Sequence, residues 1–180
     1  GLGTREETKK AVLQILEKIK IPVVIDADAL KAVAGQKVLK KISAVITPHA
    51  GEFKILTGIE LPGDVEKRKK IALQEAEKLG TTILLKSPVD IIASHDGRAK
   101  LNATGNAGMT VGGTGDVLAG LVAGFVAQKL EPFAAACCAA FANGAAGDEL
   151  YKSKGYCFNA SDLAEEIPYT IKRIIGLSLG

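Results

Sequence analysis

The sequence predicts an α/β fold in which a doubly wound, mostly parallel central sheet carries helices on both faces. Three observations predict this class. Short apolar runs rich in β-branched residues alternate with segments of helical periodicity, two later runs flank a hairpin turn, and the C-terminal third is a mostly helical region. The chain has 180 residues, of which 47% are hydrophobic, and this is enough for one sizeable core. We therefore expect a single domain over residues 1–180.

The first half of the chain alternates helices with buried strands. Thr4 and Glu7 form a capping-box pattern, and apolar residues then recur at helical spacing as far as Lys20. Residues 22–25 and 44–47 are continuous apolar runs, which is typical of strands that are buried on both faces of a parallel sheet. Two further helices are predicted, one that begins within 51–56 and one that spans 65–79.

The second half begins with sheet and ends with helices. Residues 82–85 form another apolar strand, and the runs 90–94 and 99–102 flank a strong hairpin turn at 95–98. An antiparallel edge is therefore expected to follow the parallel part of the sheet. Helices are predicted over residues 115–128, from 132 to about 151 and, with an N-terminal cap, from about 161 to 175.

Composition argues against several classes of protein. The net charge of +3 is modest, and lysines alternate with glutamates along 66–75, which indicates a solvated face and no nucleic-acid surface. No uninterrupted apolar run reaches about 18 residues and no export signal opens the chain, so we expect neither a membrane span nor export. Cys137, Cys138 and Cys157 lack CxxC spacing, and reduced thiols in a cytoplasmic protein are the simplest interpretation.

The segment from Asn102 to Asp116, NATGNAGMTVGGTGD, is the most informative part of the sequence. It places small and flexible residues directly before an apolar helix, with Gly112, Gly113 and Gly115 at its end. Glycines let successive backbone N–H groups point toward one centre, and the positive end of the helix dipole adds to the attraction for an anion. The pattern predicts a phosphate cradle beside which Asp116 accepts a hydroxyl proton. For an isolated GxGD motif, an ordinary turn with a helix cap is the simpler interpretation.

Polar residues also follow the predicted strands, at the sheet edge where open α/β folds bind ligands. His49 and Glu52 come after the second strand, and Lys86 ends the third. No HxxxH or cysteine spacing accompanies His49, so we predict no dedicated metal site. Lys86 either steadies nucleotide phosphates or is a solvated lysine at a strand end. Asp26 and Asp28 either hold a magnesium ion through water or orient a substrate, or else they cap the helix that follows.

Four blocks of sequence together resemble the NAD(P)H-hydrate dehydratase family of the ribokinase-like superfamily. They are DADAL at 26–30, TPHAGEF at 47–53, Lys86 after its apolar strand, and GNAGMTVGGTGDVLAG at 105–120. GxGD occurs across ribokinase-like kinases, whereas TPHxGEF together with GMxxGGTGDVLAG is characteristic of this family. The resemblance spans nearly the whole chain and implies a ribokinase-like fold. The opening GLG at 1–3 resembles the end of the family's GPGLG turn, so we expect the chain to cover the C-terminal two-thirds of the family domain, without its N-terminal strands and helices.

The resemblance also implies roles for the matching positions. Asp116 would be the catalytic base. The nucleotide would lie against Lys86, Ser87, Pro88, Val89, Asp90, Asn106, Ala107, Gly108, Met109, Thr110, Val111, Gly112, Gly113, Thr114 and Gly115. The hydrated nicotinamide would lie against Gly1, Gly3, Thr47, Pro48, His49, Ala50, Gly51, Glu52, Phe53 and Asp116. The chain departs from the family pattern where Ser87 replaces a glycine, which bears on the nucleotide contacts of that loop, and where Ala50 replaces a common proline.

The activity implied by the resemblance is nucleotide-dependent repair of hydrated NADH or NADPH. ADP or ATP, with Mg²⁺, would phosphorylate the ring hydroxyl, and the ring nitrogen would then expel phosphate, which is a better leaving group than hydroxide. Bifunctional relatives imply an upstream epimerase domain, and the sequence leaves a homo-oligomer open. Two alternatives stay open as well: a ribokinase-like kinase of a vitamin precursor, and a nucleotide-binding module without activity.

Overall fold

Five strands form one sheet within residues 2–177, the part of the chain that the computed structural model describes. In chain order they are β1 (Val23–Ile25), β2 (Ala44–Ile46), β3 (Thr82–Leu85), β4 (Asp90–Ala93) and β5 (Ala99–Asn102). The strands lie side by side in this order, and the parallel pairs β1–β2 and β2–β3 are followed by the antiparallel pairs β3–β4 and β4–β5. Four strands therefore run in one direction and β4 runs against them, which confirms the mostly parallel sheet with an antiparallel hairpin.

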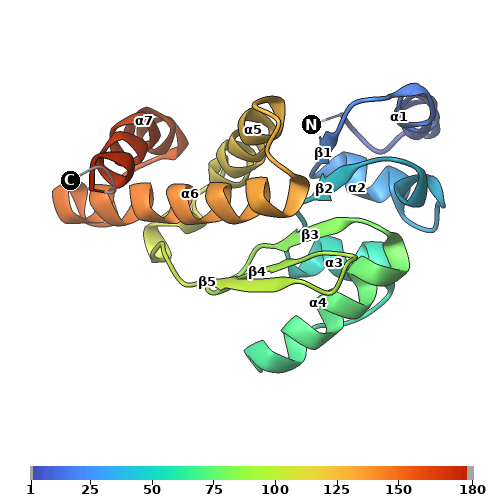
Figure 1. The fold of residues 1–180 in the computed structure, drawn as a ribbon, viewed down its shortest axis with the longest axis horizontal. Coiled ribbons are helices and arrows are strands. Elements are labelled where there is room, and N and C mark those ends of the chain that lie inside the picture. Colours follow the sequence, from blue (N-terminus) through green and yellow to red (C-terminus); the bar gives the residue numbers. More distant parts are fainter. Residues whose placement is uncertain (1, 178–180) are drawn as a thin grey trace.

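Seven α-helices of the described residues cover both faces of this sheet (Figure 1). They are α1 (Glu6–Lys18), α2 (Asp28–Val33), α3 (Ala50–Thr57), α4 (Val65–Leu79), α5 (Thr114–Ala127), α6 (Pro132–Lys154) and α7 (Ala160–Leu177), with two short 3-10 helices, η1 (Val38–Lys41) and η2 (Ala107–Thr110). Helices α1 to α4 pack on one face, α5 and α6 pack on the other, and α7 packs on the outside of α5 and α6. The predicted helices on both faces and the helical C-terminal region are confirmed.

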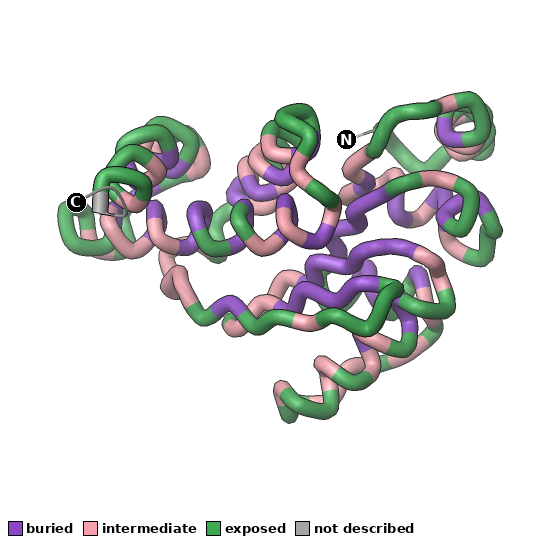
Figure 2. The backbone as a smooth tube through the Cα atoms, in the orientation of Figure 1, coloured by how far each residue is buried: buried purple, intermediate pink, exposed green. Residues whose placement is uncertain are grey.

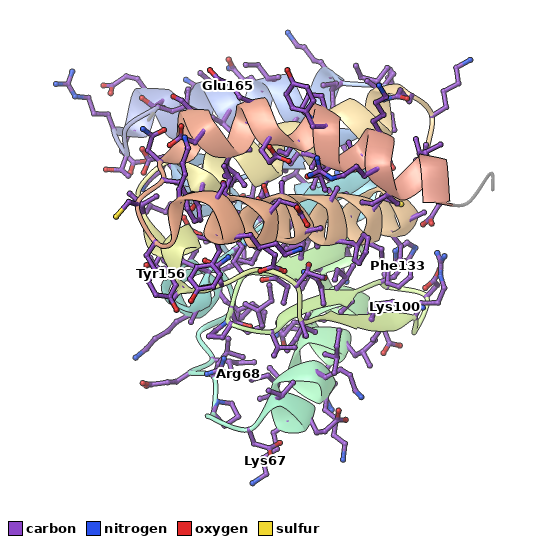
Figure 3. All side chains as sticks on the ribbon, turned by 90° about the vertical axis from the view of Figure 1, so that its left-hand side faces the viewer. Lys67, Arg68, Lys100, Phe133, Tyr156 and Glu165 are labelled. Carbon is purple, nitrogen blue, oxygen red and sulfur yellow. The ribbon has the colours of Figure 1, made fainter. Side chains whose placement is uncertain are left out.

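The layers are clearest from the side (Figure 3). Helix α7, which carries Glu165, is outermost, and α6 lies between it and the sheet. The hairpin strand that carries Lys100 lies beneath α6, and α4 with Lys67 and Arg68 lies on the far face of the sheet. The molecule is therefore a helix–sheet–helix sandwich with one additional helix outside it.

Side chains of the central strands alternate between two cores. Ile46, Ile83 and Leu85 pack with α1 to α4, whereas Val45 and Leu84 pack with α5 and α6. All five are fully buried, and β2 and β3 form the buried centre of the molecule (Figure 2). Because successive side chains of a strand point to opposite faces, this continuous apolar pattern requires helices on both sides.

The start of α1 differs from the predicted one. Arg5 is the N-cap and makes no side-chain capping bond, so the predicted Thr4–Glu7 capping box is wrong. Gly3 has a φ of +79° and donates its amide to Asp28 Oδ2 over 3.0 Å, and this contact carries the chain in an extended path past Thr4 before the first helical turn begins. Glu6 and Glu7, in the first turn, instead interact favourably with the positive end of the helix dipole. The helix also ends at Lys18, before the predicted Lys20, because Ile19 adopts an extended conformation.

The later elements follow the prediction closely. The predicted segments 65–79, 82–85 and 99–102 coincide with α4, β3 and β5. Helix α6 continues to Lys154, beyond the predicted end near 151, and neither η1 nor η2 was predicted. No helix within residues 2–177 is both long enough and apolar enough to cross a bilayer.

Candidate active site

The carboxyl ends of β1, β2 and β3 lie at one edge of the sheet, next to the N-terminus of α5. The pairing of β2 with β3 continues past both strands, because the Lys86 amide donates to the Pro48 carbonyl over 2.9 Å and His49 and Lys86 form a parallel bridge. Helix α5 packs beside β1. The residues that follow the three strands therefore meet the glycine-rich turn, as predicted from the positions of strand ends in parallel sheets.

The Lys86 ammonium lies at the centre of this edge. Its Nζ is 2.9 Å from Asp26 Oδ1 and 3.8 Å from Glu52 Oε2. A Cβ on Gly115 would lie 3.4 Å from the same nitrogen, so the ammonium also touches the first turn of α5. The Lys86 side chain is only 20% exposed, so the alternative of a solvated lysine at a strand end is wrong. A cation held here by two carboxylates faces the end of a helix that attracts anions.

His49 forms the N-terminal cap of α3. Its Nδ1 accepts from the amides of Gly51 and Glu52 over 3.0 and 3.2 Å, and the Glu52 carboxylate accepts from the His49 amide over 2.9 Å. This is a capping box in which histidine replaces the usual serine or threonine. Nδ1 is thus occupied, and Nε2 lies 3.5 Å from Glu52 Oε2, while 58% of the side chain is exposed to solvent. This cap was not predicted, although the spacing of three residues between His49 and Glu52 was its signal in the sequence.

The N-terminus of α5 is open. Gly113, with a φ of +95°, is the N-cap residue and provides no side-chain capping bond. Among the described residues, the amides from Gly112 to Asp116 have no hydrogen-bond acceptor. The Asp116 side chain is exposed in the first turn of the helix. Unpaired amides at the positive end of a helix of 14 residues are suited to bind an anion. Asp116 makes no capping bond, so the structure does not support the alternative in which it only caps the helix.

The first part of the glycine-rich segment is bound to α6. Asn106 Nδ2 donates to the Gly147 carbonyl over 2.9 Å and to Asp148 Oδ1 over 3.2 Å. Asn106 Oδ1 accepts from the Gly108 amide over 3.0 Å, and Met109 packs against Gly147. The Asn106 and Met109 side chains therefore point toward α6, so any nucleotide contact predicted for them would come from backbone or neighbouring atoms.

The rest of this segment, up to Val111, forms hydrogen bonds with the first residue of α5. Thr114 is buried, and its hydroxyl donates to the carbonyls of Met109 and Val111 over 2.7 and 2.9 Å. Thr110 donates to the Ala107 carbonyl over 2.8 Å, while the Thr110 and Val111 residues themselves are exposed. Residues 107–114 thus form a continuous bonded path into the open turn.

The loop from Lys86 to Asp90 is a closed turn. Asp90 Oδ1 accepts from the Ser87 amide over 3.0 Å, and the Ser87 hydroxyl donates to the Val89 carbonyl. Asn102 donates to Asp90 Oδ2 over 3.2 Å, which ties the loop to β5. Burial raises the pKa of the Asp90 carboxyl, although these bonds oppose the shift. The Asp90 carboxylate is thus engaged within the protein, and Pro88 is the exposed member of the loop.

Asp26 and Asp28 do not act as a pair. Asp26 bonds to Lys86, whereas Asp28 accepts from the Gly3 amide and from Lys31 Nζ over 2.9 Å. The hydrogen bond from Lys31 makes the largest contribution to lowering the pKa of Asp28, and the bond from the Gly3 amide makes the next largest. The N-cap of α2 is Ala27 and carries no side-chain bond, so the helix-cap alternative is wrong. Gly1, which was also predicted to contact the substrate, lies outside the described residues.

The segment 47–53 has a buried part and an exposed part. Thr47 and Phe53 are fully buried. The Phe53 ring belongs to the core between α3 and the sheet, so it is not exposed to contact a substrate as predicted. The Thr47 hydroxyl is buried and has no hydrogen-bond partner among the described residues. His49, Ala50 and Gly51 are exposed at the site, and buried Glu52 reaches Lys86 from beneath them.

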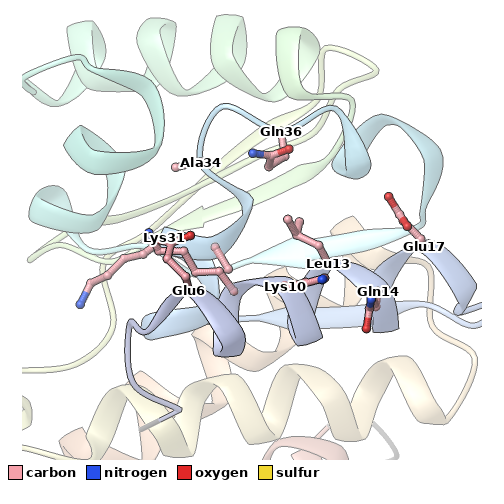
Figure 4. Close-up of a pocket in the computed structure, with 10 residues that line it drawn as sticks. Glu6, Lys10, Leu13, Gln14, Glu17, Lys31, Ala34 and Gln36 are labelled. Carbon is pink, nitrogen blue, oxygen red and sulfur yellow. Dashed lines mark hydrogen bonds and ion pairs between the residues drawn. The ribbon is translucent and has the colours of Figure 1, made fainter.

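A separate cavity of about 450 Å³ lies between α1 and α2 (Figure 4). Apart from Leu13 and two alanines, charged or amide side chains line it. No residue predicted for catalysis, nucleotide or substrate belongs to its lining. We therefore place the candidate active site at the carboxyl edge of the sheet, where Lys86 and the open turn of α5 converge.

Comparison with known proteins identifies relatives described as NAD(P)H-hydrate dehydratases or repair enzymes. A family model described as NAD(P)H-hydrate dehydratase matches residues 1–169. A bifunctional NAD(P)H-hydrate repair enzyme of Pyrobaculum aerophilum is 48% identical over 176 residues, which cover 96% of this chain and 34% of that protein. An ADP-dependent (S)-NAD(P)H-hydrate dehydratase of Cenarchaeum symbiosum is 40% identical, with 96% of this chain and 60% of that protein covered. The chain thus spans less than two thirds of the length of these relatives.

Solved structures agree with the fold. The ADP/ATP-dependent NAD(P)H-hydrate dehydratase of Bacillus subtilis, co-crystallised with ATP and Mg²⁺, matches with a TM-score of 0.83 and 32% identity over 96% of this chain and 62% of that one. Arabidopsis thaliana ribokinase, complexed with ribose and ATP, matches with a TM-score of 0.60 and 17% identity over 88% of this chain and 52% of that one. The second match shows the ribokinase-like fold alone.

Proposed function

The chain belongs to the NAD(P)H-hydrate dehydratase family, and we propose that it repairs hydrated NADH or NADPH at the expense of ADP or ATP. The observation that carries this proposal is the position of the Lys86 ammonium. It lies between the carboxylates of Asp26 and Glu52 and against Gly115, directly beside the open amides of α5. A phosphate chain needs this combination of a fixed cation and unpaired amides.

The open turn is where the transferring phosphoryl group would lie. Amides from Gly112 to Gly115 would donate to its oxygens, and the dipole of α5 would add to their attraction. Lys86 would contact the phosphates from the strand side of the site. These donors are fixed before the ligand binds, so they stabilise the charge that develops during transfer without reorganising.

In this proposal Asp116 starts the reaction. Its exposed carboxylate, in the first turn of α5, would take the proton of the ring hydroxyl, and that oxygen would bond to the terminal phosphorus of the nucleotide. The bond from this phosphorus to the bridging oxygen breaks, and the shortened nucleotide leaves. The ring nitrogen lone pair then expels phosphate, and loss of a proton from the neighbouring ring carbon restores the reduced nicotinamide.

The substrate ring would bind on the side of α3. The exposed edge of the His49 ring lies there, and exposed Ala50 and Gly51 offer a surface without bulky side chains. Gly3, which is bound to Asp28, lies at the end of the segment before α1. We propose that these residues contact the hydrated nicotinamide, with Asp116 reaching its hydroxyl.

The residues at this edge also suit Mg²⁺. Two carboxylates, Asp26 and Glu52, converge there, and oxygen donors of this kind together with nucleotide phosphates are the usual ligands of this ion. Within residues 2–177 no group of three or more histidine, cysteine or acidic side chains forms a closed metal cage, so the phosphates would complete the coordination. When bound, Mg²⁺ would neutralise phosphate charge.

The experiment that tests the proposal follows the return of NADH absorbance. The protein is mixed with purified hydrated NADH, Mg²⁺ and either ADP or ATP. We expect absorbance to recover with one or both nucleotides and to require Asp116. Asp116→Asn should abolish the recovery, whereas Glu165→Gln, on the exposed outer surface of α7, should leave it unchanged.

Two results would overturn the proposal. If a phosphorylated alcohol accumulates and NADH absorbance does not recover, the protein is a kinase of another small molecule. If the protein is folded and binds nucleotide but neither product forms, it is a nucleotide-binding module in the form tested.

A further inference from the structure

One carboxylate on α6 joins that helix to the segment that leads into the open turn. Asp148 Oδ2 accepts from the Gly105 amide over 3.0 Å, and Asp148 Oδ1 accepts from Asn106 Nδ2 over 3.2 Å. These partners are 43 and 42 residues away in the sequence. Asn106 passes the connection on, because its Oδ1 accepts from the Gly108 amide at the start of η2.

The helix surface beneath this segment has no room for side chains. A Cβ on Gly144 would come within 2.6 Å of the Thr104 carbonyl carbon and oxygen. A Cβ on Gly147 would come within 2.9 Å of Met109 Cγ. Gly105 itself has a φ of +100°, which is unfavourable for other residues. The segment is therefore seated on a glycine surface of α6, with the Asp148 bonds beside it.

We propose that Asp148 is a positioning residue for the phosphate-binding turn, an inference that rests on the proposed function. The bonded path runs from Asp148 through Asn106 to η2, and then from Met109 to the hydroxyl of buried Thr114, the first residue of α5. A shift at Asp148 is thereby passed to the amides that would hold the phosphoryl group. Amides that already point at the phosphoryl group stabilise the charge of the transition state, and they do so better when their positions are fixed.

The bonding of Asp148 distinguishes it from a carboxylate that only adds charge to the surface. The described residues place no cation in an ion pair with it, and both of its oxygens accept from the segment. Hydrogen bonds to an ionised acceptor are stronger than neutral ones, so a partly buried carboxylate without a counterion is well suited to fixing backbone geometry. Its neighbour Glu149 forms surface ion pairs with Lys152 and Arg173.

Asp148→Asn tests the proposal at constant size. The introduced asparagine would still accept from Gly105, but its amide nitrogen would face Asn106 Nδ2, so that two donors oppose each other. We expect amide hydrogen exchange over residues 103–117 to accelerate about tenfold and kcat for repair to fall about tenfold, with the nucleotide KM changed less than about threefold. Glu149→Gln is the matched control, since it removes the same charge from the next residue.

The proposal is wrong if Asp148→Asn behaves like Glu149→Gln in both the exchange and the kcat measurement. If the wild type lacks repair activity, the proposed function fails, and the exchange measurement still decides whether Asp148 positions the turn.

Discussion

Gly113, the N-cap of α5, has a conformation and a space that suit only glycine, so Gly113→Ala should destabilise the protein in two ways. Its φ of +95° is a region where an L side chain costs about 1 to 2 kcal/mol. A Cβ there would come within 2.9 Å of the Ala160 Cβ, and an overlap of this kind costs about 1 to 3 kcal/mol. We expect the free energy of unfolding, measured by urea denaturation, to fall by about 2 to 5 kcal/mol.

Ala160→Gly offers a matched rescue because it removes the methyl group that the new Cβ would meet. Alone it should cost up to about 1 kcal/mol at the first residue of α7, and in the double variant it should restore the part of the loss that overlap causes. Gly112→Ala is the control, since no atom lies within 4 Å of its added Cβ. The account of this turn is refuted if Gly113→Ala is as stable as Gly112→Ala, or if Ala160→Gly does not rescue it.

Three further predictions concern the site and the caps. Lys86→Met removes the cation beside α5, so kcat/KM for repair should fall by about 10² to 10³, and a fall below about threefold would exclude the proposed role. His49→Ala should cost about 1 kcal/mol of stability in thermal melts because two α3 amides lose their acceptor, whereas His49→Asn should keep the cap; equal melting temperatures for the two variants would contradict this. Burial raises the pKa of Glu131, but the Arg98 guanidinium and two α6 amides outweigh it and hold that pKa below its ordinary value. The resulting stabilisation is present above about pH 4.3 and is lost as pH falls through the lowered folded-state pKa. Urea titrations in this acid range should therefore show the stability difference between wild type and Glu131→Gln shrinking as pH falls, and a constant difference would argue against the linkage.

Periodicity was sufficient to predict most of the fold. The apolar runs that became β2 and β3 are continuous because helices cover both faces of the sheet, and the sequence shows this directly. The predicted capping box at Thr4 was wrong, because Gly3 bonds to Asp28 and this contact determines where α1 begins. A local pattern gave no sign of that bond, which joins residues 25 positions apart.

The residues of the candidate site were predicted, but the long-range contacts that join them were not. Glycines before α5 and Lys86 after β3 are visible as local motifs, and the structure brings them together. The ion pair of Lys86 with Asp26 spans 60 residues and the bond of Asp148 to Gly105 spans 43, so both depend on the tertiary fold. The predicted epimerase domain and homo-oligomer stay predictions.

A crystal structure of this protein with a non-hydrolysable ATP analogue would show directly where the phosphates bind. The terminal phosphate should accept from the amides between Gly112 and Gly115, lie within contact of Lys86 Nζ and leave Asp116 facing its open side. Phosphates bound elsewhere, for example in the cavity between α1 and α2, would contradict this prediction.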